Sequence, residues 1–155
     1  MQTLFPTLVA LYLILGGNEV KGDEAMIQGT WKVVFIEEGG RKVPPCDLDR
    51  TLRAFEEMQM KVVITKDRYT VKAKDLTFGS KPYKLDPSRR PRWFDLDSLR
   101  TPEGKELGPN LGIYELKGDD LKICLGKSAK DRPTSFDSSQ DSAVDVLLIM
   151  KREKP

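Results

Sequence analysis

The chain has 155 residues, of which 39% are hydrophobic and 32% are charged, and its formal net charge is +2. This length and apolar content suit one domain with a single core, and the nearly balanced charge argues against a nucleic-acid partner. The sequence contains no histidine. Histidine is the usual general base near neutral pH and the commonest metal ligand, so most catalytic templates are excluded. We therefore expect neither an enzyme nor a cofactor or metal site.

An apolar run at residues 4–15 marks the N-terminal segment. It is shorter than the about 20 residues that span a bilayer, and it matches the apolar centre of a secretory signal. Val20 and Gly22 supply small residues before a cut at Asp23. We expect residues 1–22 to be a signal peptide on an extracytoplasmic (periplasmic or secreted) protein, with no stable membrane insertion after its removal. No basic residue precedes the run, so an uncleaved anchor or a buried N-terminal helix is the alternative.

Strand patterns dominate the rest of the chain, residues 23–155. Residues 30–37 form the first expected strand, whereas residues 47–58 place apolar side chains at helical spacing and predict one short helix that caps an end. Alternation predicts further strands, and the change of phase at Gly79 predicts a bulge or a turn. Gly118-Asp119-Asp120 predicts a hairpin. These further strands are expected at residues 60–64, 69–74, 76–85, 93–96, 111–117, 121–125 and 144–150.

About eight strands without crossover helices predict an all-β, antiparallel, up-and-down barrel, because closure removes the exposed edges of the sheet. Closure pairs the first strand with the last, so Trp31 and Arg152 meet at one base of the barrel. We expect the guanidinium of Arg152 to stack on the Trp31 ring, a cation–π contact worth ~1–2 kcal/mol. Gly29 is expected to let the backbone pass close beneath that ring.

The barrel interior is either filled by side chains or hollow enough for one small ligand, and the sequence leaves both alternatives open. Three tyrosines, Tyr69, Tyr83 and Tyr114, are the polar groups expected in the lining. The predicted inward-facing residues are Trp31, Val33, Phe35, Met60, Val62, Ile64, Tyr69, Val71, Tyr83, Leu85, Phe94, Leu96, Tyr114, Leu116, Leu121, Ile123, Leu125, Val144, Val146, Leu148 and Met150.

A basic run with an aromatic neighbour, Arg89, Arg90 and Arg92 before Trp93, is a candidate binding element. It suits a phosphate or nucleic-acid contact, a cationic gate at the barrel mouth, or a solvated turn whose arginines cover apolar surface. If its loop borders the open end of the barrel, it favours a ligand with an apolar body and an anionic head, such as a fatty acid.

Two further sets of residues have competing interpretations. The pairs Asp95/Asp97 and Asp119/Asp120 resemble calcium or acid–base carboxylates, but exposed strand positions and a hairpin turn explain them better. The two cysteines, Cys46 and Cys124, form one disulfide in an oxidising compartment or stay separate thiols.

Gly29-Thr30-Trp31 at the head of the first strand resembles the opening G-x-W motif of lipocalins. More specifically, residues 26–153 are similar to a planctomycete family of lipocalin-like domains of unknown function. The similarity is carried by QGTWKVV, YKLDPSRRPRWFDL, LGIYELKGDDLKICL, RPTSF and VLLIMKRE, in that order. The resemblance implies the barrel and supports export, and it brings no catalytic residues.

Three functions are compatible with the sequence: a binding protein for a small apolar or amphipathic molecule, an extracytoplasmic structural or protein-interaction domain with a solid core, and, as the least favoured, an enzyme. A hollow interior favours the first, and a filled barrel with an exposed apolar patch favours the second.

Overall fold

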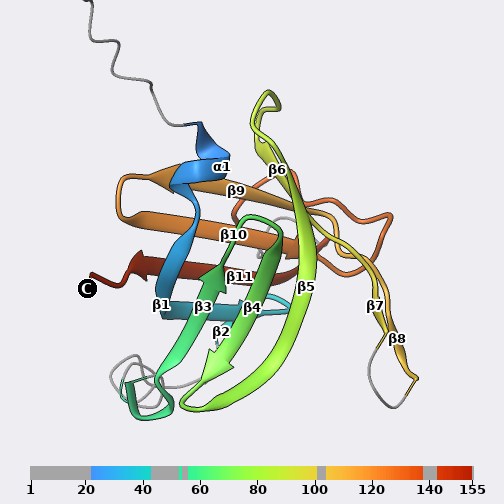
Figure 1. Cartoon of the computed structure of the whole chain (residues 1–155). Helices are drawn as coiled ribbons and strands as arrows, with labels where there is room; N and C mark the ends of the chain where they lie inside the picture. The colour runs from blue at the N-terminus through green and yellow to red at the C-terminus, as the bar shows by residue number, and fades with distance from the viewer. Residues whose placement is uncertain (1–21, 43–52, 54–55, 101–103, 138–142, 155) are drawn as a thin grey trace, which may run out of the picture.

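The computed structural model describes residues 22–42, 53, 56–100, 104–137 and 143–154. They form the predicted all-β architecture, a closed antiparallel barrel of eight strands (Figure 1). The barrel strands are β1 (Gly29–Glu38), β3 (Met60–Ile64), β4 (Arg68–Ala73), β5 (Leu76–Asp86), β6 (Arg92–Leu96), β9 (Gly112–Lys117), β10 (Asp120–Gly126) and β11 (Val144–Arg152). The remaining elements are α1 (Asp23–Met26), β2 (Arg41–Lys42), β7 (Leu99–Arg100) and β8 (Glu106–Leu107).

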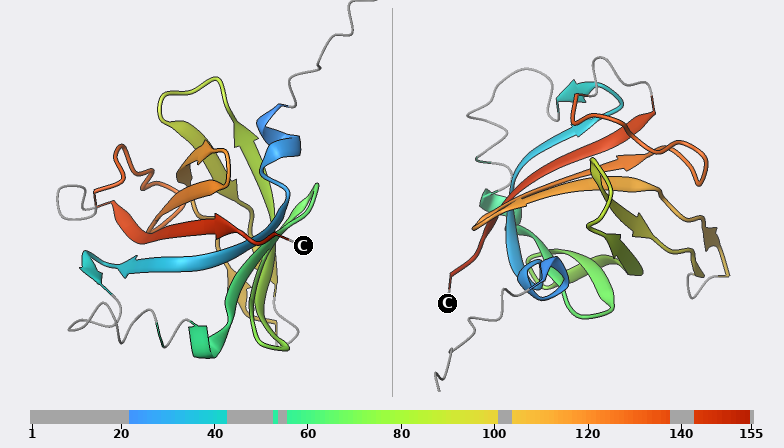
Figure 2. Two further views of the ribbon diagram at one scale, coloured as in Figure 1. Left: turned by 90° about the vertical axis from the view of Figure 1, so that its left-hand side faces the viewer. Right: turned by 90° about the horizontal axis from the view of Figure 1, so that it is seen from above.

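The barrel closes between β1 and β11, which pair antiparallel with Trp31 opposite Arg152. Each barrel strand also pairs with the next one along the chain, so the topology is up-and-down as predicted. Figure 2 shows β1 and β11 side by side in both views.

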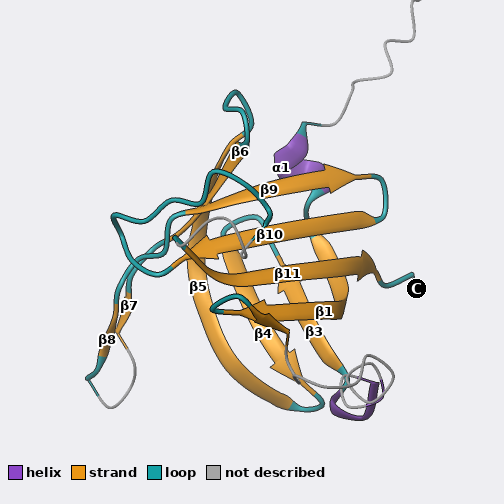
Figure 3. Cartoon of the chain, turned by 180° about the vertical axis from the view of Figure 1, so that it is seen from behind, coloured by secondary structure: helices purple, strands orange, loops and turns teal. Residues whose placement is uncertain are grey.

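The two ends of the barrel differ. Helix α1 lies at the end where β1 begins, together with the β3–β4 turn and the β5–β6 loop, and we call this the α1 end (Figure 1). The β4–β5 turn and the β7–β8 hairpin lie at the opposite end, the far end (Figure 3). Of the predicted helix 47–58, Arg53 and residues 56–58 are described and helical. The other residues of that segment lie outside the described part of the chain, so its capping role stays a prediction.

Large side chains pack the interior tightly toward the α1 end. Trp31, Ile64 and Phe94 are buried there, and Tyr69, Tyr83 and Tyr114 place their rings around Phe94 with centroid distances of 5.6, 5.4 and 6.4 Å. Ile27, just after α1, is also fully buried and joins this core.

Bulges change which residues face inward. The change of phase predicted at Gly79 is a bulge in β5, because Val71 opposes Gly79 while Lys72 opposes Thr77. A second register shift, between Val33 and Phe35, turns Ile36 into the core and Phe35 out of it. The inward assignment of Phe35 is therefore wrong. Side chains of a strand alternate between its two faces, and the extra residue at a bulge reverses this alternation for the residues that follow.

A second, smaller cluster lies outside the main core. It consists of Ile113, Cys124, Val144 and Leu147, with Phe35, Trp93 and Phe136 packed against it. The inward assignment of Val144 is therefore also wrong, because the β10–β11 register shifts between Leu125 and Gly126. The apolar residues at outward positions, Ile113, Cys124 and Leu147, were the sequence signal for this cluster.

Candidate functional site

The Trp31–Arg152 contact expected at the barrel base is present. The guanidinium carbon of Arg152 lies 4.2 Å from the centroid of the Trp31 ring, and the indole Nε1 donates to the carbonyl of Ile27 at 2.8 Å. Gly29 has a φ of +136°, and a Cβ there would lie 2.8 Å from Arg152 Nη1. Glycine is needed there to make room for the guanidinium as well as for its φ, so this base has a structural role.

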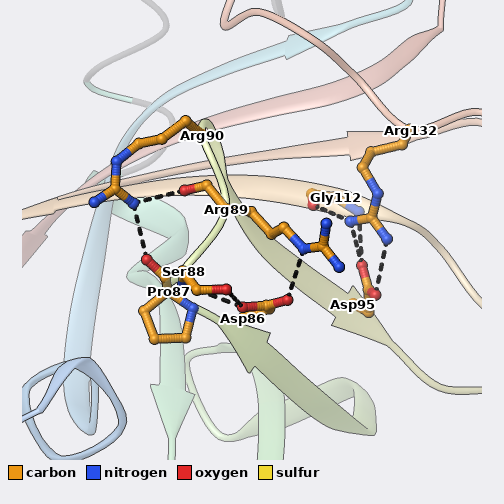
Figure 4. A network of polar contacts seen from close by, with 8 residues as sticks. All are labelled: Asp86, Pro87, Ser88, Arg89, Arg90, Asp95, Gly112 and Arg132. Atoms are coloured by element: carbon orange, nitrogen blue, oxygen red, sulfur yellow. Dashed lines mark hydrogen bonds and ion pairs between the residues drawn. The ribbon is translucent and has the colours of Figure 1, made fainter.

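The arginine loop joins β5 to β6 at the α1 end (Figure 1), and Figure 4 shows the contacts of Arg89 and Arg90. Arg89 pairs with Asp86 at 3.0 Å and lies 4.3 Å from the centroid of the Trp93 ring. Arg90 donates to the carbonyls of Pro87 and Arg89 at 2.9 and 2.7 Å. Two of the loop's three guanidinium charges are thus balanced locally, because Arg92 also pairs with Asp23 at 2.8 Å.

A hollow of about 430 Å³ lies beside this loop. Arg90, Arg92, Tyr114 and Phe136 are among the residues that line it. The Tyr114 hydroxyl donates to Asp23 Oδ2 at 2.6 Å, and burial, reinforced by Asp23, raises the pKa of Tyr114. The Asp23 carboxylate therefore links α1 to Arg92 of β6 and to Tyr114 of β9. These two polar side chains of the hollow are thus engaged in structural contacts.

Two adjoining pockets inside the barrel lie toward the far end, with volumes of about 270 and about 200 Å³. Tyr69, Val71, Leu125 and Val146 line both. A cavity of about 150 Å³ already holds benzene, so each pocket can take a small ring. The barrel is therefore filled toward the α1 end and hollow toward the far end. The other lining residues are Gly79, Lys81, Leu96, Leu99, Leu107, Asn110 and Asp145 in the larger pocket, and Val33, Ile36, Glu38, Met60, Val62 and Leu148 in the smaller.

Tyr69 is the one predicted tyrosine that lines these pockets. Its side chain is 5% exposed, and no residue in the described ranges forms a hydrogen bond with its hydroxyl. Burial raises the pKa of Tyr69, so the phenol stays protonated and able to donate. The Tyr83 hydroxyl, by contrast, donates to the carbonyl of Thr65 at 2.7 Å. A buried donor without a partner is uncommon in native proteins, so this hydroxyl, which bonds no described residue, is a candidate contact for a ligand.

Lys81, which is not among the site residues predicted from the sequence, is the cation of the larger pocket. It lies directly opposite Tyr69 in the β4–β5 ladder. Its Nζ donates to the carbonyl of Gly108 at 2.9 Å and to Asn110 Oδ1 at 3.1 Å, and within the described part of the chain it pairs with no carboxylate. Burial lowers the pKa of Lys81. The sequence did hold a signal for this inward lysine. After the bulge at Gly79, Lys81 has the same parity as Tyr83 and Leu85, so all three belong to the same face of β5.

Three of the four aspartates in the predicted pairs form ion pairs, whereas Asp97 Oδ1 accepts from the backbone N–H of Ser98 at 2.8 Å. Asp95 accepts two bonds from Arg132, at 2.6 and 2.9 Å, while Arg132 also stacks 3.9 Å from the centroid of the Trp93 ring. Asp119 pairs with Arg152 at 3.2 Å, and Asp120 with Lys151 at 2.8 Å. Among the described residues, no three acidic or cysteine side chains gather as metal ligands.

Two further predictions fall partly or wholly outside the described ranges. Cys124 is buried in the second cluster, whereas Cys46 lies outside the described residues, so the choice between a disulfide and two separate thiols stays a prediction. The export segment, residues 1–21, is also outside these ranges. Within them, no helix is long and apolar enough to cross a membrane.

No family model, curated protein or solved structure matches the chain. The similarity to the planctomycete lipocalin-like family therefore stays a proposal, resting on the sequence segments that carry it.

Proposed function

We propose that this protein is an exported, lipocalin-like barrel that binds one small molecule with an apolar body and an anionic head in the pockets toward the far end. The observation that carries the proposal is the hydroxyl of Tyr69, which is buried against apolar side chains, directly opposite Lys81, and bonded to no described residue. An apolar pocket with a few convergent polar groups is the usual form of a small-molecule site.

The anionic head is assigned to Lys81 rather than to the arginine loop. The loop lies at the α1 end, whereas Lys81 lines the larger interior pocket. Its ammonium group is held by two neutral oxygens, so an incoming anion adds a charge-assisted hydrogen bond without displacing a carboxylate. Glu38 and Asp145 line the smaller and the larger pocket respectively, and they disfavour an anion placed away from Lys81.

Two dyes with the same apolar rings test this assignment. Anilinonaphthalene sulfonate carries an anionic head, and N-phenylnaphthylamine carries none. We expect wild-type protein to bind both with micromolar dissociation constants, measured by fluorescence titration. Lys81→Met should weaken the sulfonate dye about tenfold and leave the neutral dye unchanged, since one charge-assisted hydrogen bond is lost.

Val71→Phe tests the place of binding. Val71 lines both pockets and opposes Gly79, which has no side chain, so a phenyl ring has room to fill the hollow. This variant should lose both dyes, whereas Arg90→Ala, at the hollow beside the arginine loop, should bind like wild type. Near-ultraviolet circular dichroism checks that each variant is folded.

The alternative is a solid-core structural or interaction domain, which the tight packing toward the α1 end supports. Failure of wild type to bind either dye would favour that alternative. Unchanged binding by Val71→Phe would show that the dyes bind elsewhere on the protein. Unchanged binding of both dyes by Lys81→Met would be consistent with binding in the pocket but would contradict the preference for an anionic head. Export is tested separately, by whether the mass of protein recovered from its native host lacks residues 1–22.

A further inference from the structure

Strand β5 begins, at the far end of the barrel, with exposed apolar side chains. Leu76 is 67% exposed and Phe78 is 66% exposed, the highest values among the described large apolar residues. Met58, 44% exposed, precedes β3, where Met60 pairs with Ala73, which in turn pairs with Leu76. Three of the four exposed large apolar side chains in the described ranges therefore lie at the far end. We call the surface formed by Leu76, Phe78, Lys72 and Lys74 the hairpin tip.

Lysines flank these apolar side chains. Lys72 and Lys74 are both exposed, and neither forms an ion pair with a described carboxylate. Lys72 stands at the end of a row of directly opposed lysines that runs through Lys61 to Lys32. Lys61 and Lys32 are balanced by Glu153 at 2.8 Å and Glu56 at 3.6 Å. Among the described residues, Lys72 and Lys74 therefore leave net positive charge at the hairpin tip, which the adjacent Asp75 offsets only in part.

We propose that the hairpin tip docks the barrel onto the surface of an anionic lipid bilayer. An aromatic and an aliphatic side chain beside lysines is the combination that anchors peripheral proteins in the interface, where the apolar groups enter the acyl boundary and the lysines remain at the headgroups.

Two observations favour a lipid surface over a protein partner. The exposed apolar residues are few, whereas stable protein interfaces bury about 1,200–2,000 Å² in total. The second is charge, because Lys72 and Lys74 pair with no described carboxylate and suit anionic headgroups. β5 pairs with β6 only from Tyr83 to Asp86, so its first residues keep a free edge, and the test below therefore includes a protein interface as an outcome. The place of the hairpin tip also supports a lipid surface, because the tip and the interior pockets lie toward the same end of the barrel. The inference does not depend on the proposed ligand, since docking requires no occupied pocket.

Co-sedimentation with vesicles tests the docking surface. The protein is mixed with phosphatidylcholine vesicles, and with vesicles of phosphatidylcholine and phosphatidylglycerol in equal parts. We expect wild type to sediment with the mixed vesicles and far less with the neutral ones. Leu76→Ser/Phe78→Ser should lower the partition coefficient about tenfold or more, and Lys72→Gln/Lys74→Gln about 30-fold.

The chain offers a matched control for charge. Lys66 and Lys84 are exposed, lie toward the α1 end, and pair with no described carboxylate. Lys66→Gln/Lys84→Gln removes the same charge as the tip variant and should bind vesicles nearly like wild type. Phe78→Trp adds a direct readout, because brominated lipid should quench an indole placed at the tip more than the native Trp31 and Trp93.

The outcomes separate the proposal from its rivals. Absence of wild-type sedimentation with the mixed vesicles would overturn it, as would equal loss in the tip and control lysine variants. A dimer in solution that Leu76→Ser/Phe78→Ser dissociates would identify the tip as a protein interface instead. Dye binding in the interior is measured without vesicles, so the docking surface and the proposed ligand site can fail independently.

Discussion

Arg152 and Trp31 are directly opposed across the seam that closes the barrel, and the guanidinium of Arg152 lies over the Trp31 ring. The same guanidinium donates from Nη1 to the carbonyl of Gln28 at 2.8 Å, and from Nη2 to the carbonyl of Met26. One side chain from the last strand therefore satisfies backbone carbonyls at the end of α1 and at the residue before β1, groups that would otherwise lose a partner.

Arg152→Ala should lower the free energy of unfolding by about 1–3 kcal/mol, because it removes the stacking on Trp31 and the donors to both carbonyls. Urea unfolding followed by tryptophan emission measures the change. Lys154→Ala is the matched control, since Lys154 pairs with the same Asp119, at 3.4 Å, but is exposed. It should change stability by less than about 0.5 kcal/mol. Equal effects of the two substitutions would contradict a special role for Arg152.

Asp23 should hold α1 against the barrel through Tyr114. Asp23→Ala is expected to cost about 1–3 kcal/mol, because it leaves the hydroxyl of a 1% exposed tyrosine without an acceptor. In a Tyr114→Phe background the same substitution should cost less, since no orphan hydroxyl remains. A double-mutant cycle on the free energies of unfolding measures the difference, and strictly additive effects would show that this hydrogen bond is not what holds α1.

Stability should fall in alkaline solution above the ordinary tyrosine pKa of 10.0. Burial raises the pKa of Tyr69 and of Tyr114 in the folded protein, so the unfolded chain loses these protons first. The unfolded state then binds fewer protons than the folded state, and the free energy of unfolding decreases as pH rises. Melting temperatures measured between neutral and strongly alkaline pH test this. Tyr69→Phe should flatten the decline, and a slope identical to wild type would argue against burial of an uncharged phenol at this position.

The sequence alone determined the barrel and its closure. Alternation of apolar and polar residues in the strands is local, and eight such strands without crossover helices have few ways to bury one face each. The meeting of Trp31 and Arg152 followed from that closure, because the first and last strands must then pair. The bulge in β5 was also predictable, since Gly79 stands where the phase of alternation changes.

Only the tertiary structure decided where the hollow lies and which cation lines it. Phe35 and Val144 leave the core because bulges shift registers between strands that are distant in the chain, and no local pattern reports that partner. The arginine loop follows β5 at the α1 end, whereas Lys81 lies within β5 and reaches Gly108 and Asn110, which precede β9. The pockets exist because the side chains that different strands contribute leave space toward the far end. Packing volume is a property of the assembled barrel, so the filled and hollow halves could be distinguished only after all of its strands were in place.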